Sequence, residues 1–208
     1  WSNFGGIYVE LLEKLGPTSF VGYDTLECGA IVNALISGGE VAERLEAGQE
    51  GEIILSTTPF YAEMGGEVGD TGIIFAGESV ARVLDTKAPE AGLTVHKVKI
   101  ESGSFSVGEE VTASVDAKRR ASIARNHTCT HILHAALREV LGAHVKQAGS
   151  YVGPDRLRFD FTHFEALTPE QIAQVEELAN SYIMQAIPTT RYETSLDEAR
   201  NSGVTALF

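Results

Sequence analysis

The sequence predicts an α+β fold, in which a small β-barrel is followed by a region of mixed helices and strands. Residues 25–116 contain six or more short apolar runs separated by Gly-containing turns, a pattern typical of small barrels. Residues 117–208 instead combine apolar positions at helical spacing with one alternating strand. The 208 residues, 43% of them hydrophobic, suffice for one large or two small domains.

The N-terminal part begins with residues 1–24, which we interpret as a linker from an upstream region. The piece Ile7–Leu12 is short and either helical or strand-like, and Gly16 and Pro17 follow it closely. The barrel strands are then expected at apolar runs that alternate with turns: 53–55, 73–75, 80–84, 95–100 and 107–115.

The C-terminal part begins with a helix expected over residues 118–141, which Gly142 ends. A Gly-bearing loop is expected at Gln147–Ser150, and a half-buried strand at Leu157–Phe161. Thr168 and Gln171 form a predicted capping box for the next helix, which Pro188 stops. A last helix is expected to open at Ser195 and to end at Gly203.

Composition favours a cytoplasmic protein. No stretch is long and apolar enough to span a membrane, and no signal peptide opens the chain. The two cysteines form no CxxC pair and suggest no disulfide framework, as expected in a reducing compartment. Trp1 and the apolar run to Phe208 suggest that both ends are cuts in a longer polypeptide.

The charge of the chain is unevenly distributed. The net charge is −13, yet residues 118–158 hold eight Lys or Arg against two acidic residues, a local charge of +6 that leaves −19 elsewhere. Because salt screens charges beyond about 8–10 Å, this basic segment could attract phosphates despite the overall acidity. The alternative is that it pairs with the acidic remainder. Reversing the charges of Arg119 and Arg120 would distinguish phosphate binding from pairing with the acidic remainder of the chain.

His127 and His131 lie four residues apart within the predicted helix, so both side chains stand on one face. Two imidazoles in this arrangement can share a metal ion, usually zinc, although a solvated face remains the alternative. Thr128 follows the first histidine, which excludes the His-Glu-x-x-His proteases. His134 and Arg138 fall on the same stripe, which we expect to point away from the core.

A Gly-rich segment, Thr57–Gly72, holds four of the 21 glycines. Glycines allow close approach of the backbone to a ligand, although a set of β-turns is the commoner explanation. The segment is neither a phosphate-binding P-loop nor a dinucleotide fingerprint, because no Gly-Lys-Ser/Thr follows and no helix opens after it.

Four segments, in the same order along the chain, resemble motifs of the alanyl-tRNA synthetases. Thr58-Pro-Phe-Tyr-Ala-Glu-x-Gly-Gly-x-Val-Gly-Asp-Thr-Gly72 is similar to their Gly-rich motif. Arg125-Asn-His-x-x-Thr-His-Ile-Leu-His134 is similar to the zinc helix of their editing domain. Val145-Lys-Gln-x-Gly-Ser150 and Arg156-Leu-Arg-Phe-Asp-Phe161 follow in register.

The resemblance implies an enzyme that attaches alanine to tRNA(Ala) using ATP, with a separate editing domain that hydrolyses tRNA mischarged with serine or glycine. It implies zinc held by His127 and His131 together with a later Cys-x3-His pair. It also implies that Gln147 lies in the editing pocket and that Thr58 senses the serine hydroxyl. The expected partner is tRNA(Ala), with no DNA, no membrane and no indication of oligomerisation.

The implied architecture is a barrel at 25–116 and a two-layer α/β editing core at 117–208, of the type called the second additional domain in threonyl- and alanyl-tRNA synthetases. The Cys-Gly-Gly-Thr-His segment of the family is absent, so half of the zinc site is expected here. ATP and Mg²⁺ belong to an aminoacylation domain outside these residues. Glu67 replaces the family's Gln. The alternatives are a non-catalytic tRNA-binding module and a free-standing editing protein.

Overall fold

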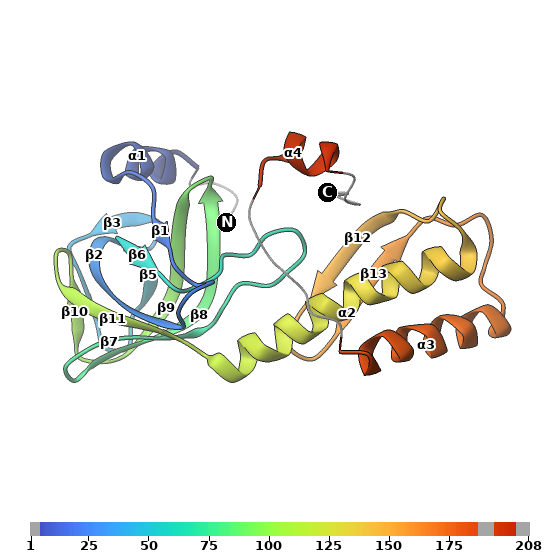
Figure 1. Cartoon of the computed structure of the whole chain (residues 1–208). Helices are drawn as coiled ribbons and strands as arrows, with labels where there is room; N and C mark the ends of the chain where they lie inside the picture. The colour runs from blue at the N-terminus through green and yellow to red at the C-terminus, as the bar shows by residue number, and fades with distance from the viewer. Residues whose placement is uncertain (1–4, 187–193, 203–208) are drawn as a thin grey trace. The chain divides into compact units, whose positions relative to one another are not determined.

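The protein is a mixed α+β chain, seen in a computed structural model that describes residues 5–186 and 194–202 (Figure 1). The chain divides into two compact units. The barrel unit comprises Trp1–Met64 and Val68–Ala121, and the second unit comprises Gly65–Glu67 and Ser122–Phe208. Three residues of the Gly-rich segment therefore belong to a different unit from the rest of that segment.

Six antiparallel strands close the barrel, as predicted. Around it, each strand bonds to the next in the order β11, β7, β8, β9, β5 and β2, and β2 returns to β11. Their bounds are Glu110–Val115 (β11), Gly72–Ala76 (β7), Ser79–Glu90 (β8), Leu93–Ser102 (β9), Glu50–Leu55 (β5) and Glu27–Ser37 (β2). Closure removes the unpaired edges that an open sheet of this size would expose.

The remaining strands of the barrel unit are short. They are β3 (Glu40–Ala42) on β2, β10 (Ser104–Ser106) with β4 (Arg44–Glu46), and β1 (Ser19–Phe20) parallel to β6 (Thr57–Thr58).

Alternation along the strands fills the barrel interior. In β11, Val111, Ala113 and Val115 are buried, and the residues between them are half-buried. These side chains join a core that includes Leu35, Leu45, Ile53, Phe60, Ile74, Val98, Ile100 and Phe105. A pleated strand turns alternate residues inward, so this pattern follows from the sequence period of two.

Residues that we interpreted as part of a linker form a helix, α1 (Gly5–Leu15). Its residues Tyr8 and Leu11 are buried in a cluster with residues of β2, β5 and β9. The Tyr8 hydroxyl also reaches both carboxylate oxygens of Glu52, each at 2.9 Å. Burial and this contact raise the pKa of Tyr8. A helix of 11 residues is only marginally stable by itself, so α1 depends on tertiary packing. Its local sequence alone therefore does not predict it.

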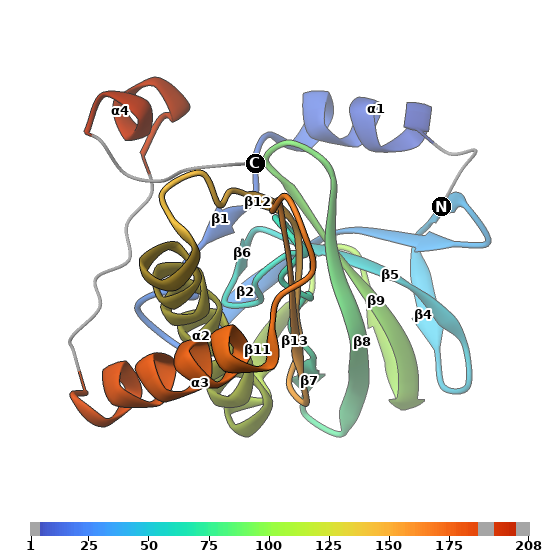
Figure 2. The same cartoon turned by 90° about the vertical axis from the view of Figure 1, so that its right-hand side faces the viewer.

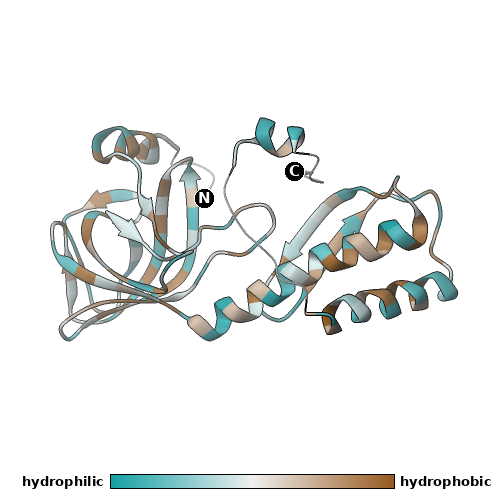
Figure 3. Cartoon of the chain, in the orientation of Figure 1, coloured by the Kyte–Doolittle hydropathy of each residue, from teal (hydrophilic) through white to brown (hydrophobic). Residues whose placement is uncertain are grey.

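The second unit contains most of α2 (Ala117–Leu141), the hairpin of β12 (Gln147–Val152) and β13 (Leu157–Phe161), and the helices α3 (Pro169–Met184) and α4 (Leu196–Asn201). Ala136 and Leu137 of α2 pack with Val145 and with Val175 of α3. Figure 2 shows α3 running beside α2, and Figure 3 shows hydrophobic positions recurring along both helices.

The predicted helix at 118–141, the strand at 157–161 and the capping box at Thr168 are confirmed. The loop predicted at Gln147–Ser150 is wrong, because these residues begin β12. Pairing with β13 supplies the ladder, and a bulge between Gln147 and Gly149 absorbs the irregular local sequence. The predicted end signals Pro188 and Gly203 lie outside the described residues. Within the described part, no helix has the length and apolarity to cross a membrane.

Candidate functional site

The two histidines predicted to share a face of α2 point at each other. Their Nε2 atoms lie 3.0 Å apart, with ring centroids at 5.0 Å. Two nitrogens bound to one tetrahedral zinc at the usual bond length stand about 3.3 Å apart, so this spacing fits two zinc ligands. His131 is exposed and the His127 side chain is 33% exposed, which leaves room for further ligands. Among the described residues, no group of three or more His, Cys, Asp or Glu could hold a metal ion.

The other ring nitrogen of His127, Nδ1, contacts the carboxylate of Glu67. Glu67 reaches the histidine because the 65–67 segment is attached to β12. The Val152 N–H donates to the Gly66 carbonyl at 2.8 Å, and the Ser150 hydroxyl donates to the Gly65 carbonyl at 3.2 Å. Glu67 forms an isolated parallel bridge with Val152.

Glycine is required at position 66 for two reasons. Its φ is +85°, a conformation that favours glycine, and a Cβ there would lie 2.5 Å from the Ser150 carbonyl oxygen. Gly66 therefore allows the backbone of this part of the Gly-rich segment to lie close to β12, and this places Glu67 next to His127 of α2.

His134 does not lie on a solvated face as we expected. It is only 9% exposed, its ring lies 5.1 Å from that of Phe159 on β13, and its Nε2 has no hydrogen-bond partner in the described structure. A helical projection shows the angle around the axis but not the position along it. Two turns beyond His127, the same stripe is covered by the hairpin.

Gln147 and Thr58, the other two predicted site residues, fall in different units. Gln147 is the first residue of β12 in the second unit and is half-buried. Thr58 is fully buried in the barrel unit. The structure brings together His127 and His131, and it adds Glu67, whose role the sequence did not reveal.

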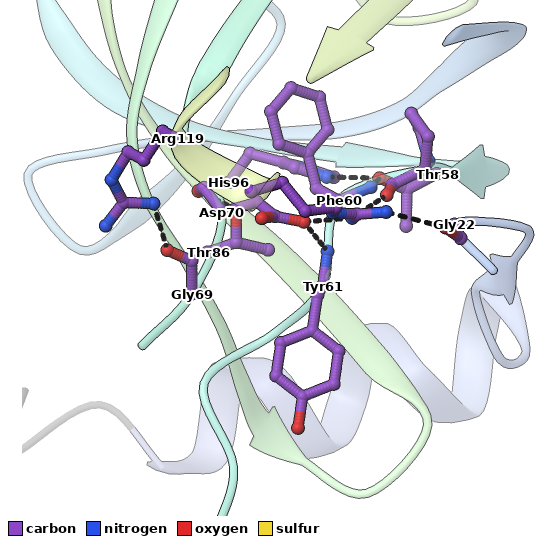
Figure 4. A network of polar contacts seen from close by, with 11 residues as sticks. Gly22, Thr58, Phe60, Tyr61, Gly69, Asp70, Thr86, His96 and Arg119 are labelled. Atoms are coloured by element: carbon purple, nitrogen blue, oxygen red, sulfur yellow. Dashed lines mark hydrogen bonds and ion pairs between the residues drawn. The ribbon is translucent and has the colours of Figure 1, made fainter. Parts of the chain in front are cut away.

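The Thr58 hydroxyl is hydrogen-bonded inside the barrel unit (Figure 4). It lies 2.7 Å from His96 Nε2 and accepts the Phe60 N–H at 3.1 Å. His96 Nδ1 faces the Ile53 carbonyl oxygen at 2.8 Å, so Nδ1 carries the proton of the neutral ring. Nε2 is therefore an acceptor, and the Thr58 hydroxyl donates to it.

A second buried contact joins the Gly-rich segment to the start of α2. Asp70, also seen in Figure 4, accepts the Tyr61 N–H at 2.7 Å and forms an ion pair with Arg120. The Arg120 guanidinium also donates to the carbonyl oxygens of Gly22 and Pro59, each at 2.6 Å. Sequence reasoning missed this pair, whose members are 50 residues apart.

The same contacts correct our expectation that reversing the charges of Arg119 and Arg120 would test phosphate binding. Arg119 donates to the Gly69 carbonyl at 2.9 Å, and Arg120 is bound as described. Reversing both charges would disrupt the barrel unit, so a loss of RNA affinity in that variant would not identify a phosphate contact.

Burial gives His96 a measurable pH signature. Burial lowers its pKa to about 4, and the hydrogen bond to Ile53 opposes that shift. The unfolded chain binds the His96 proton near pH 6.5, so the stability from the neutral ring is complete above that pH. We expect about 3 kcal/mol to be lost as the pH falls from 6.5 to about 4.

Denaturant unfolding at several pH values checks this expectation, with His96→Gln as the comparison. The parent should lose more stability than the variant across that window. Equal losses would show that His96 does not contribute to the acid sensitivity.

Comparison with known proteins identifies the family to which this chain belongs. Residues 7–119 match the family described as tRNA synthetases class II (A), and this match covers more than half of the 208 residues. The chain therefore belongs to the class II (A) tRNA synthetases, and its relatives within that family are alanine–tRNA ligases.

The sequence is 48% identical over 207 residues to the alanine–tRNA ligase of Pelotomaculum thermopropionicum, covering 100% of the chain and 24% of that ligase. It is 50% identical over 199 residues to the ligase of Thermus thermophilus, covering 96% of the chain and 22% of the ligase. The chain thus spans about a quarter of the length of these curated relatives.

Proposed function

We propose that these residues form the editing module of an alanine–tRNA ligase, which hydrolyses tRNA(Ala) mischarged with serine or glycine. The observation that carries the proposal is the convergence of His127 Nε2 and His131 Nε2 at 3.0 Å on one helix. Two facing imidazoles supply half of a tetrahedral zinc site, and the family's downstream Cys-x3-His pair would supply the other half. The fold of 117–208 is proposed to be the editing type.

The whole enzyme, in this proposal, attaches alanine to tRNA(Ala) in the cytoplasm. ATP and Mg²⁺ act in an aminoacylation domain outside residues 1–208. The partner of the present residues is tRNA(Ala), and neither DNA nor a membrane is a partner.

The chemistry proposed is ester hydrolysis. Water adds to the carbonyl carbon, the bond to the ribose oxygen breaks, and the products are the free amino acid and uncharged tRNA. His127 and His131 would hold a zinc ion, which would supply Lewis acidity or orient the terminal adenosine. Gln147, at the start of β12, offers a carboxamide that can both donate to and accept from the ester end of the substrate.

The serine-sensing role of Thr58 is a further part of the proposal, and it carries a specific requirement. The Thr58 hydroxyl already bonds His96 and Phe60, so it would have to exchange a partner to contact serine. We therefore expect Thr58→Val to lower the free energy of unfolding by about 1–3 kcal/mol, because His96 Nε2 and the Phe60 N–H lose their partner.

Thr57→Val is the matched control for this change, since Thr57 is the half-buried neighbour on β6. Denaturant unfolding compares the two variants. If Thr58→Val is as stable as Thr57→Val while the ratio of serine to alanine ester hydrolysis changes, substrate sensing accounts for Thr58 better than structure does.

Zinc binding tests the metal part of the proposal. The 208-residue chain should bind zinc weakly, with His131→Ala removing that binding, and a ligase that adds the Cys-x3-His pair should bind about one zinc per chain. Competition with a chromophoric chelator measures both. Tight binding that survives His131→Ala would contradict the ligand assignment.

A non-catalytic tRNA-binding module is the competing function. Its support was the basic segment, but Arg119 and Arg120 are bonded within the barrel unit. Hydrolysis of serine-charged tRNA(Ala), absent in a mere binding module, separates the two functions.

A further inference from the structure

Glu67 is an acidic side chain that contacts the histidine pair through His127. Its side chain is 13% exposed, and its carboxylate meets His127 Nδ1 on the side of the ring away from His131. A carboxylate at neutral pH only accepts hydrogen bonds. The contact therefore requires the proton of the neutral His127 ring to be on Nδ1, which leaves a lone pair on Nε2.

We infer that Glu67 is a positioning residue that fixes His127 as the Nδ1–H tautomer and turns its Nε2 lone pair toward His131. The metal role of that lone pair rests on the proposed function, whereas the tautomer does not. Metal-binding histidines commonly donate their second N–H to a carboxylate, which sets the ring orientation and raises the basicity of the ligating nitrogen.

Three features hold Glu67 in place for this task. The carbonyls of Gly65 and Gly66 are bonded to Ser150 and Val152, so the backbone on one side of Glu67 is attached to β12. The burial of the Glu67 side chain limits competition from water. Because the carboxylate is charged, its hydrogen bond to His127 is stronger than the bond that a neutral carboxamide would make.

The resemblance to the family places a Gln where this chain has Glu67. A Gln side-chain oxygen can also accept from Nδ1–H, but it carries no charge. The substitution therefore keeps the tautomer and adds electrostatic support for a cation at Nε2. In the metal-free chain, the His127 lone pair accepts instead from the Nε2–H of His131, 3.0 Å away.

The tautomer is measurable without metal, by long-range ¹H–¹⁵N NMR of the histidine side chains at about pH 8.5, where ordinary histidines are neutral. The parent chain should show His127 as Nδ1–H. Glu67→Ala should shift His127 toward Nε2–H, and Glu67→Gln should retain Nδ1–H. Glu176→Ala, which removes an exposed carboxylate of α3, should change nothing. A parent with Nε2–H, or a Glu67→Ala variant that keeps Nδ1–H, would overturn the inference.

Zinc affinity provides the second readout, with zinc alone as the probe. Glu67→Ala should weaken binding by about 10- to 100-fold, and Glu67→Gln by less. Unchanged affinity in Glu67→Ala would overturn the positioning role. If the parent and the longer ligase bind no zinc, the metal part of the proposed function fails, and the tautomer alone decides the inference about Glu67.

Discussion

Replacing both His127 and His131 with alanine in an alanine–tRNA ligase that contains these residues should abolish hydrolysis of serine-charged tRNA(Ala). Metal-ion catalysis contributes several kcal/mol, and each 1.36 kcal/mol is a factor of ten, so the rate should fall by about 100-fold or more. Attachment of alanine should persist, because we propose that it occurs in a domain with its own core. Parallel deacylation and aminoacylation assays measure the two activities.

A control for the loss of histidine as such is His144→Ala. His144 lies 2.9 Å from His163 between ring nitrogens and stacks on Phe164. This variant should keep deacylation within a few-fold of the parent, a margin of about 1 kcal/mol. If the double variant also hydrolyses serine-charged tRNA(Ala) at the parental rate, His127 and His131 are not the metal ligands of the reaction.

Arg120→Ala should destabilise the barrel unit by about 3–5 kcal/mol, because it leaves the buried carboxylate of Asp70 without its counterion. Asp70 has a side chain only 4% exposed, and the Arg120 side chain is 19% exposed. The variant also removes the donors that satisfy the carbonyls of Gly22 and Pro59. Denaturant unfolding measures the free energy, and such a loss is a large share of the stability of a domain.

Arg82→Ala is the matched comparison, since it breaks an exposed ion pair with Glu101 in the same unit. Such surface pairs contribute about 0–1 kcal/mol. Combining Arg120→Met with Asp70→Asn should recover part of the loss, because no buried charge remains. If Arg120→Ala lowers the free energy of unfolding no more than Arg82→Ala does, the Asp70 carboxylate is hydrated. The ion pair between Arg120 and Asp70 then does not stabilise the Gly-rich segment.

The barrel was predictable because its information is local. Short apolar runs, separated by turns that contain glycine, identified β5, β7, β8, β9 and β11. For the opposite reason, the sequence did not decide between helix and strand for α1 and did not predict that β12 begins at Gln147. Neither segment has a strong local preference, and each is specified by its partners: the barrel surface for α1 and β13 for β12.

The candidate site also contains residues that local sequence patterns predict and residues that they do not. His127 and His131 are four residues apart, so helical geometry alone brings them to one face. Glu67 is 60 residues from His127, and His96 is 38 residues from Thr58. Periodic sequence patterns do not predict contacts between residues that far apart in the chain. These contacts depend on the closed barrel and on the attachment of the 65–67 segment to β12.

The most direct test of the central claim is a metal titration of deacylation in the longer ligase. Zinc is removed with a chelator and returned in steps while hydrolysis of serine-charged tRNA(Ala) is followed. Activity should be lost, should return at about one zinc per chain, and should not recover in the His127→Ala, His131→Ala variant. Full activity in the zinc-free protein, or recovery in the variant at the same zinc concentration, would contradict the assignment of His127 and His131 as metal ligands.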